Sequence, residues 1–361
     1  MVAIVGRAVH ARGVACISLQ KGSAEWPPVL PRCLAVVVAI TMTVGVLSFA
    51  SAWVFYQDDR QRSRATMVGT LTIELPEGRG LGTAVLVDGC GILTNFHAVF
   101  GPWYVTALRA PSRKVPGTFT LTEAIRPDGT RPSARAVPVV WGDYRGPDRH
   151  LRVPHHDWAY LVLDPCLGLE YGHFRLRDPD LDEPVGAIDG FAAIGYSTGQ
   201  QMVDPVCSVQ VAPSGGGSRS WRHNCALEAG DSGGPIIRRG TLTLVALGAR
   251  SVADPADPQC PTGSVRFGGA PLARWTEGCT NAAVPLTPDI IDRVEAAYVA
   301  VRVQRALIEL GYDAGPLGAV DEPRASAAIR QVQREMGWAV SGEPGHPLLK
   351  ILLLRLKLMV S

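Results

Sequence analysis

Short apolar runs separated by glycine-containing turn signals fill the middle of the chain. Asp88-Gly89, Asp128-Gly129 and Arg239-Gly240 each lie between such runs. This pattern is typical of β-strands joined by tight turns rather than of helices. The 39 glycines and 28 prolines among 361 residues agree with it. We therefore expect a mostly β structure in the centre of the chain, and the length leaves room for at least one further folded unit.

The charge of the chain is nearly balanced. Its formal net charge is +2, and 19% of its residues are charged. A protein whose main partner is nucleic acid usually has a strongly basic domain or face. The sequence therefore predicts no nucleic-acid partner.

An uncharged stretch covers residues 33–57. It exceeds the roughly 20 apolar residues that a helix needs to cross a bilayer, so it predicts a membrane partner. Two interpretations are open, a transmembrane anchor and a signal peptide. The Ala-Ser-Ala sequence at 50–52 suits signal cleavage, whereas the N-terminal tail, residues 1–32, is long for a signal peptide and favours a retained anchor. Positively charged residues lie on both sides of this stretch, so they specify its orientation only weakly.

Six of the eight cysteines follow this stretch. An even number in an exported chain is typical of disulfides. Because the chain has no C-x-x-C pair, the spacing does not favour zinc, and we expect no metal and no cofactor. Neighbours along the chain give the predicted pairs Cys207 with Cys225 and Cys260 with Cys279, which leaves Cys90 and Cys166, whose pairing the sequence does not decide.

The stretch LEAGDSGGPII, residues 227–237, places Ser232 in a glycine-rich loop before an apolar run. The loop alone fits an ordinary turn. A serine hydroxyl becomes a nucleophile only when a base takes its proton and a third group orients that base. His97 follows two apolar runs in GTAVLVDGCGILTNFHAVF and is the candidate base. Asp157 precedes a buried-strand pattern in HDWAYLVLD, where a carboxylate is costly unless a partner such as a histidine donates to it.

Together, LTNFHAV, HDWAYLVLD and GDSGGPI occur in the order His, Asp, Ser and resemble the chymotrypsin-like (trypsin-like) serine peptidases, particularly their compact bacterial branch. The resemblance covers residues 66–281. It implies a double antiparallel β-barrel and a serine endopeptidase with His97, Asp157 and Ser232 as its triad and a protein or peptide as its substrate. It also implies that the backbone N–H groups of Gly230 and Ser232 form the oxyanion hole.

The same resemblance bears on the substrate pocket. Family members that cleave after Arg or Lys carry an acidic residue six positions before the nucleophile, and Ala226 stands there, which argues against basic specificity. The expected strand 241–251 would form one pocket wall, with Ser251 pairing with the substrate backbone. Two orientations of Arg250 are open. Facing the pocket it would favour an acidic side chain by a charge-assisted bond, and otherwise it points to solvent.

After residue 281 the pattern becomes helical. Thr287 followed by Pro288 is a helix start signal, and Gly311 is a stop signal. We expect a linker with a helix over 282–297 and a small three-helix module over 298–358, whose second and third helices cover 323–336 and about 347–358.

The segments VQRALIELGYDAGPLG and AAIRQVQREMGWAVSGEP resemble the peptidoglycan-binding-like domain at the ends of many bacterial envelope enzymes. The resemblance implies a peptidoglycan partner and a periplasmic or cell-envelope location. The chain departs from the family pattern at Gly318-Ala319, Asp321-Glu322, Ala325 and Val332. A fold tolerates such changes more easily than a glycan site does, so a structural or protein-binding role for the module stays open.

Two classes of function follow. The first is a serine endopeptidase of the bacterial envelope that works through an acyl-enzyme. The second is a catalytically latent envelope scaffold that keeps the peptidase fold. A peptidoglycan hydrolase is suggested only by the C-terminal module, since the sequence shows no paired-carboxylate site or metal cluster.

Overall fold

The computed structural model describes thirteen stretches of the chain in two compact units, Met1–Ser51 and Ala52–Ser361. The first unit contains an antiparallel hairpin of β1 (Ala8–Ala11) and β2 (Val14–Ile17). The predicted membrane segment, residues 33–57, lies outside the described residues. Within the described stretches, no helix is long and apolar enough to span a bilayer. These stretches are 8–11, 14–17, 61–62, 64–75, 78–100, 114–142, 156–176, 186–197, 199–213, 219–223, 225, 230–253 and 279–360.

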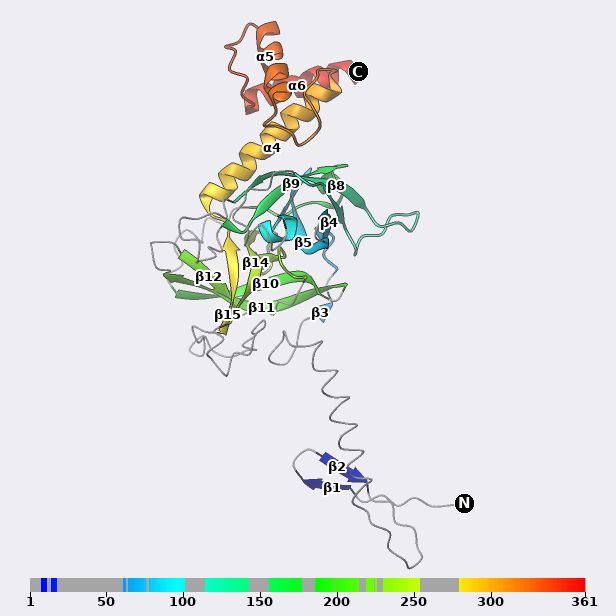
Figure 1. Ribbon diagram of the computed structural model, residues 1–361, viewed down its shortest axis with the longest axis vertical. Helices are drawn as coiled ribbons and strands as arrows, with labels where there is room; N and C mark the ends of the chain where they lie inside the picture. Colours follow the sequence, from blue (N-terminus) through cyan, green and yellow to red (C-terminus); the bar gives the residue numbers. More distant parts are fainter. Residues whose placement is uncertain are drawn as a thin grey trace, which may run out of the picture. The chain divides into compact units, whose positions relative to one another are not determined.

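A closed six-stranded barrel begins the second unit (Figure 1). Its antiparallel strands follow the order β4-β5-β6-β9-β8-β7. Apolar side chains such as Leu71, Ile92 and Phe119 fill it, as expected for strands that alternate between two faces. The strands are β4 (Val68–Leu75), β5 (Gly78–Asp88), β6 (Gly91–Thr94), β7 (Gly117–Thr120), β8 (Ser133–Trp141) and β9 (Ala159–Asp164).

A second antiparallel sheet has the order β10-β13-β14-β15-β12-β11-β3. Because β10 also pairs with β11, the strands from β10 to β11 in this order pair in a closed ring. The sequence assigned residues 282–285 to a linker, but they form the end of β15 and pair with β12 and β14, which corrects that boundary. The strands are β3 (Gln61–Arg62), β10 (Gly186–Ser197), β11 (Gln200–Pro213), β12 (Arg219–His223), β13 (Pro235–Arg238), β14 (Leu244–Ala253) and β15 (Cys279–Pro285).

Among the described residues, two disulfides cross-link this β region. One joins Cys90, in the turn between β5 and β6, to Cys166 beyond β9. The other joins Cys207 of β11 to Cys225, which lies shortly before the loop of Ser232. The structure therefore confirms the pair predicted from neighbouring cysteines and pairs the two that were left over. Cys260 lies outside the described residues, and only the backbone of Cys279 is described.

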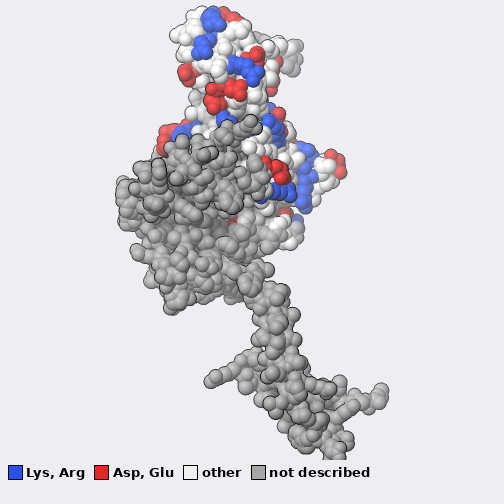
Figure 2. All heavy atoms as spheres, viewed as in Figure 1, with Lys and Arg blue, Asp and Glu red and all other residues white. Residues whose placement is uncertain are grey.

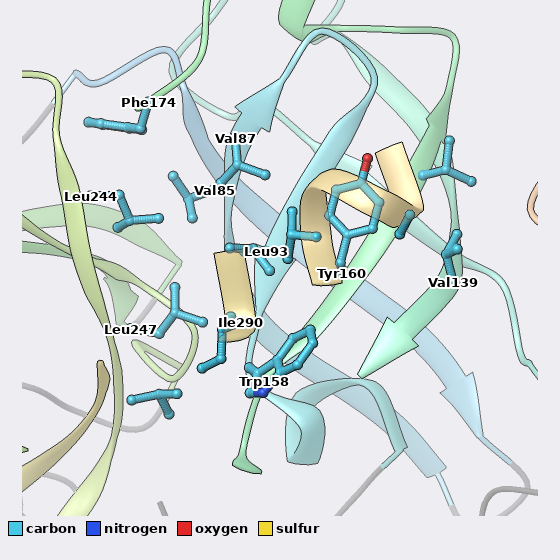
Figure 3. Packing of buried hydrophobic residues seen from close by; sticks show 14 of the residues in the cluster. Val85, Val87, Leu93, Val139, Trp158, Tyr160, Phe174, Leu244, Leu247 and Ile290 are labelled. Carbon is cyan, nitrogen blue, oxygen red and sulfur yellow. The ribbon is translucent and has the colours of Figure 1, made fainter. Parts of the chain in front are cut away.

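A single apolar cluster joins the barrel, the second sheet and the first long helix. Figure 3 shows Val85, Leu93 and Trp158 of the barrel facing Leu247 of β14 and Ile290 of the helix. The helix, α4 (Pro288–Glu309), extends this cluster with Val294, Ala297 and Val301. The start of α4 is thus packed as part of the β region.

The helical end of the chain matches its start and stop signals. The Thr287 side chain accepts a hydrogen bond from the Ile290 N–H, and Pro288 opens α4 as predicted. Gly311 follows the helix with a positive φ of 86°. The helix crosses the predicted boundary at 297/298 without a break. Besides the helical turn at 96–100, the described residues also form α3 (Gly168–Tyr171) within the β region, and α5 (Pro323–Glu335) and α6 (His346–Val360) in the C-terminal module.

The C-terminal module contacts the barrel through the segment that departs from the family pattern. Lys114 Nζ lies 2.8 Å from Asp321 Oδ1. A Cβ added to Gly318 would meet the side chains of Val137 and Val162. Leu317 is half-buried against the same apolar cluster. The departures at Gly318 and Asp321 therefore occur where the module meets the peptidase-like part of the chain.

The outer surface of the module carries both signs of charge. Figure 2 shows Lys and Arg interspersed with Asp and Glu on the visible face of the helical end. The ion pairs of the module include Arg355 with Glu335 at 3.3 Å and Arg324 with Glu322 at 3.2 Å. Such exposed pairs contribute little to stability, about 0–1 kcal/mol each, and give this face no single-sign field.

His223, at the end of β12, predicts a pH-dependent stability. Its imidazole is fully buried, and burial lowers its pKa from 6.5 to about 4, with the neighbouring Ala282 backbone opposing the shift. Between these values the unfolded chain binds a proton that the folded chain does not, so stability is complete above about pH 6.5 and falls as the pH drops toward 4. Below about pH 4, the free energy of unfolding should be lower than at neutral pH by about 3 kcal/mol because of His223.

Urea unfolding at about pH 7.5 and about pH 5 measures this effect. We expect His223→Leu to lose less stability across this interval than the wild type, by about 2 kcal/mol. His346→Leu, a change at an exposed histidine, should retain the wild-type pH dependence. An unchanged pH dependence in His223→Leu would show that His223 is not the titrating group.

Candidate active site

His97 lies just beyond β6, in a helical turn that begins at Phe96. β6 pairs with β9, with Thr94 opposite Ala159. Asp157 comes two residues before Ala159, so this register brings the aspartate beside the histidine turn. The two residues are far apart in sequence, and the pairing of β6 with β9 brings them together.

The Asp157 carboxylate binds His97 through both of its oxygens. His97 Nδ1 lies 2.7 Å from Asp157 Oδ2, and the His97 backbone N–H donates to Oδ1 at 3.0 Å. The Asn95 side-chain amide donates to the Asp157 carbonyl oxygen at 2.8 Å. The Asp157 side chain is 5% exposed, whereas the His97 side chain is 28% exposed. This geometry places the Nδ1 proton on the carboxylate side and makes Nε2 the basic atom of the ring.

The residue that follows Asp157, just before β9, packs against α4. Trp158 is buried, and the Arg293 guanidinium carbon lies 4.8 Å from the centroid of its ring. Arg293 Nη2 also donates to the Trp141 carbonyl oxygen at 2.7 Å, and the Gly142 N–H donates to the Trp158 carbonyl at 2.9 Å. A helix at the start of the C-terminal region thus contacts the residue that follows Asp157.

Ser232 occupies a turn shaped by glycines. Gly230 and Gly233 have φ values of +104° and +85°, a region that other residues rarely adopt. The Gly233 N–H donates to the Gly248 carbonyl at 2.9 Å, and the Gly248 N–H donates to Gly234 at 2.9 Å, which fixes the turn to β14. The Ser232 hydroxyl donates to the Ala249 carbonyl oxygen at 3.1 Å.

The proposed oxyanion donors lie in this turn. Within the described part of the chain, neither the Gly230 N–H nor the Ser232 N–H makes a hydrogen bond. Their carbonyl groups, by contrast, are both bound by Thr83, which accounts for the fixed backbone between them. The buried Asp231 side chain lies against Gly195 of β10. These N–H groups retain their capacity to bind a developing negative charge.

The predicted pocket residues are only partly described. Ala226 lies outside the described residues. Arg250 and Ser251 belong to β14, opposite Ala282 and Asn281, and only their backbone is described. The pocket stays a prediction. Among the residues whose structure is described, no group of three or more His, Cys, Asp or Glu side chains is arranged to hold a metal ion.

Sequence reasoning missed two buried threonines at this site. Thr83 and Thr94 have no exposed surface and link the histidine strand to the serine loop. The available signal was polar residues inside runs of buried apolar residues, since a buried hydroxyl needs a hydrogen-bond partner.

Gly233 provides a prediction about the turn. A Cβ at this position would overlap the Thr94 hydroxyl oxygen and the Thr83 carbonyl oxygen, and φ is positive. We expect Gly233→Ala to lower the free energy of unfolding by about 2–4 kcal/mol and to displace Ser232. Gly240→Ala is the control, because its φ of +74° is similar but its Cβ would meet no atom within 4 Å. Equal urea midpoints for the two variants would contradict the close approach.

The order of His97, Asp157 and Ser232 along the chain, and the contact of His97 with Asp157, resemble those of the trypsin-like serine peptidases. Several solved structures of proteases are similar to this chain in fold. A structure described as HL collagenase matches with a TM-score of 0.46 and 16% identity, covering 67% of this chain and 97% of that one. A Glu endopeptidase matches with a TM-score of 0.43 and 15% identity over 67% and 97% of the two chains. The protease Anisep from Arthrobacter nicotinovorans matches with a TM-score of 0.40 and 11% identity over 63% and 92%.

The C-terminal module has its own match. A family model described as "Putative peptidoglycan binding domain" matches residues 300–352. No curated protein matches the chain. The family match begins within α4, so this helix serves both the β region and the module.

Proposed function

We propose that the chain is a serine endopeptidase of the bacterial cell envelope. The observation that carries this proposal is the buried Asp157 carboxylate, which binds both Nδ1 and the backbone N–H of His97. A glycine-rich turn holds Ser232 next to two backbone N–H groups without partners among the described residues. Base, orienting acid, hydroxyl and oxyanion donors are the groups that acyl transfer requires.

In the proposed reaction, Ser232 Oγ attacks the scissile carbonyl carbon while His97 Nε2 takes the hydroxyl proton. The N–H groups of Gly230 and Ser232 receive the oxyanion. As the intermediate collapses, the carbon–nitrogen bond breaks and His97 gives its proton to the leaving amine. Water then attacks the acyl-enzyme while His97 takes its proton, and as the ester bond breaks His97 gives this proton to Ser232 Oγ, which releases the acid and restores the serine hydroxyl.

A second candidate is the latent scaffold with a peptidase fold. It is favoured by the Ser232 hydroxyl, which donates to the Ala249 carbonyl at 3.1 Å and must turn toward His97 before it can lose its proton to the ring. A serine hydroxyl has more than one staggered rotamer, and apo sites often hold catalytic hydrogen bonds in loose geometry. The endopeptidase is therefore our preferred proposal.

Hydrolysis of an unfolded protein substrate and of mixed fluorogenic peptides tests the activity. We expect Ser232→Ala to abolish cleavage and Ser133→Ala, at an exposed serine on β8, to retain it. Absence of cleavage by folded, disulfide-intact wild-type protein would favour the scaffold. Release of muropeptides from purified cell wall, lost in Ser232→Ala, would instead support a peptidoglycan hydrolase.

We further propose an acidic preference, with Arg250 facing the substrate. Arg250 would bind a Glu side chain by a charge-assisted hydrogen bond, and Ala226 offers no carboxylate for a basic one. The wild type should cleave Glu-containing peptides with a kcat/KM about 10–150-fold higher than that for matched Ala-containing peptides, because such bonds contribute about 1.5–3 kcal/mol. Arg250→Gln should remove the difference. Equal cleavage of both peptides by the wild type would refute the preference.

Peptidoglycan is the proposed partner of the module, and an envelope or periplasmic location follows from that partner together with the membrane segment expected at 33–57. The family match over 300–352 supports peptidoglycan as the partner. Two departures, Ala325 and Val332, are buried in the module and so belong to its core rather than to a surface site. Sedimentation of the chain with insoluble peptidoglycan tests the partner, and a chain that stays in the supernatant would favour a structural role.

A further inference from the structure

Thr83 of β5 is a fully buried polar residue whose every backbone and side-chain hydrogen-bonding group is engaged near the proposed site. Its N–H donates to the Ser232 carbonyl at 2.9 Å, and its hydroxyl donates to the Gly230 carbonyl at 2.7 Å. The hydroxyl oxygen accepts from the Tyr196 N–H at 3.0 Å. The Thr83 carbonyl accepts the Thr94 hydroxyl at 2.7 Å.

These four bonds join three parts of the fold. Thr94 ends β6 and lies three residues before His97, so it connects Thr83 to the base. Tyr196 belongs to β10 of the second sheet. Gly230 and Ser232 are the residues whose N–H groups would receive the oxyanion. Thr83 therefore holds the nucleophile turn against the second sheet through its hydroxyl and against the base strand through its backbone carbonyl.

The Thr83 hydroxyl binds the turn at Gly230, a residue type with a flexible backbone. Gly230 has a φ of +104°, and glycine also populates many other backbone conformations. The hydrogen bond to its carbonyl fixes the plane of the peptide between Gly230 and Asp231. If this bond is lost, the Gly230 carbonyl is buried without that donor and the turn gains alternative conformations in which the oxyanion donors diverge.

We propose that the Thr83 hydroxyl is a positioning group that holds the N–H groups of Gly230 and Ser232 in the orientation required to bind the oxyanion. This inference rests on the proposed peptidase function and adds a residue to its machinery. Thr83 touches neither substrate nor reacting atoms and acts only through the turn. Its loss should therefore lower kcat more than it raises KM, since the oxyanion exists only after attack.

Thr83→Val tests the inference because it keeps the shape of the side chain and removes the hydroxyl. We expect kcat for peptide hydrolysis to fall about 10–100-fold with KM changed less than about threefold, a smaller effect than deleting an oxyanion donor outright. Thr83→Ser retains the hydroxyl and should recover kcat to within about threefold of the wild type. Thr72→Val, a half-buried threonine on β4, is the matched control and should behave as the wild type.

The outcomes separate this inference from the function on which it rests. An inactive wild type overturns both. An active wild type with a folded Thr83→Val variant of equal kcat, or with Thr83→Ser as impaired as Thr83→Val, overturns the positioning role alone. If Thr83→Val does not fold, Thr83→Ala takes its place with the same expected loss of kcat. Failure of both to fold would assign Thr83 to stability and also overturn the inference.

Discussion

Asp157→Asn should lower kcat for peptide hydrolysis about 10⁴-fold, the size expected for this change in trypsin-like peptidases in general. The carboxylate accepts from His97 Nδ1 at 2.7 Å and from the His97 N–H at 3.0 Å. An amide in its place offers one acceptor oxygen and one donor group, so the ring takes the wrong tautomer for accepting the Ser232 proton. Steady-state hydrolysis of a fluorogenic peptide measures the loss.

Asp128→Asn is the control for this experiment. Asp128 lies in an exposed turn where its carboxylate accepts from the Thr130 N–H at 2.9 Å, a bond that Asn also makes. We expect wild-type kcat from this variant. Similar activity in Asp157→Asn and Asp128→Asn would show that Asp157 does not orient the base, and the proposed mechanism would fail at that step.

Removing residues 287–361 should unfold the β region. Ile290, Val294 and Val301 of α4 are at most 3% exposed and pack in the cluster shared by the barrel and the second sheet. Each side chain contributes about 1.5–3 kcal/mol by burial, so the three together approach the whole stability of a typical domain, about 5–15 kcal/mol. Circular dichroism and thermal unfolding of a chain that ends at Leu286 measure the effect.

A matched pair of point variants separates loss of this packing from loss of the module. Val294→Asp buries a carboxylate in the cluster, whereas Ala296→Asp adds the same charge at an exposed position of the same helix. Val294→Asp should lower the free energy of unfolding by more than about 3 kcal/mol, and Ala296→Asp by less than about 1 kcal/mol. A chain ending at Leu286 with wild-type thermal stability would show that α4 is dispensable.

The triad candidates were accessible from sequence because each lies in a short local pattern. His97 follows a strand and a turn, Asp157 precedes a buried strand, and Ser232 sits among glycines. The helix limits were accessible for the same reason, since Thr287 and Gly311 act through neighbouring backbone groups. Local chemistry fixes such features, and sequence reasoning finds them.

The boundary between peptidase-like part and module was not accessible. α4 carries two apolar surfaces, with Val294 and Val301 facing the β region and Val303 and Leu307 facing the module. These two apolar surfaces overlap along the helix, so no polar segment in the sequence separates the part that packs on the β region from the part that packs in the module. Residues 282–285 were likewise missed as part of β15, because their role depends on pairing with strands distant in sequence.

The role of Thr83 at the site also could not be predicted from sequence. Its sequence neighbours indicate a buried strand, but its partners Gly230, Ser232 and Tyr196 lie more than a hundred positions away. The orientation of the Ser232 hydroxyl toward Ala249 was also beyond sequence, because it depends on one rotatable bond and a carbonyl from β14. Long-range hydrogen bonds decide how the candidate residues are aligned.

The most direct test of the central claim is fluorophosphonate labelling of the folded chain from Arg64 onward, with the adduct located by peptide mass spectrometry. If His97 and Asp157 activate Ser232, the adduct forms on Ser232, disappears in Ser232→Ala and His97→Ala, and persists in Ser133→Ala. If folded, disulfide-intact protein acquires no adduct, or acquires it equally without His97, then Ser232 is not an activated nucleophile and the endopeptidase proposal is contradicted.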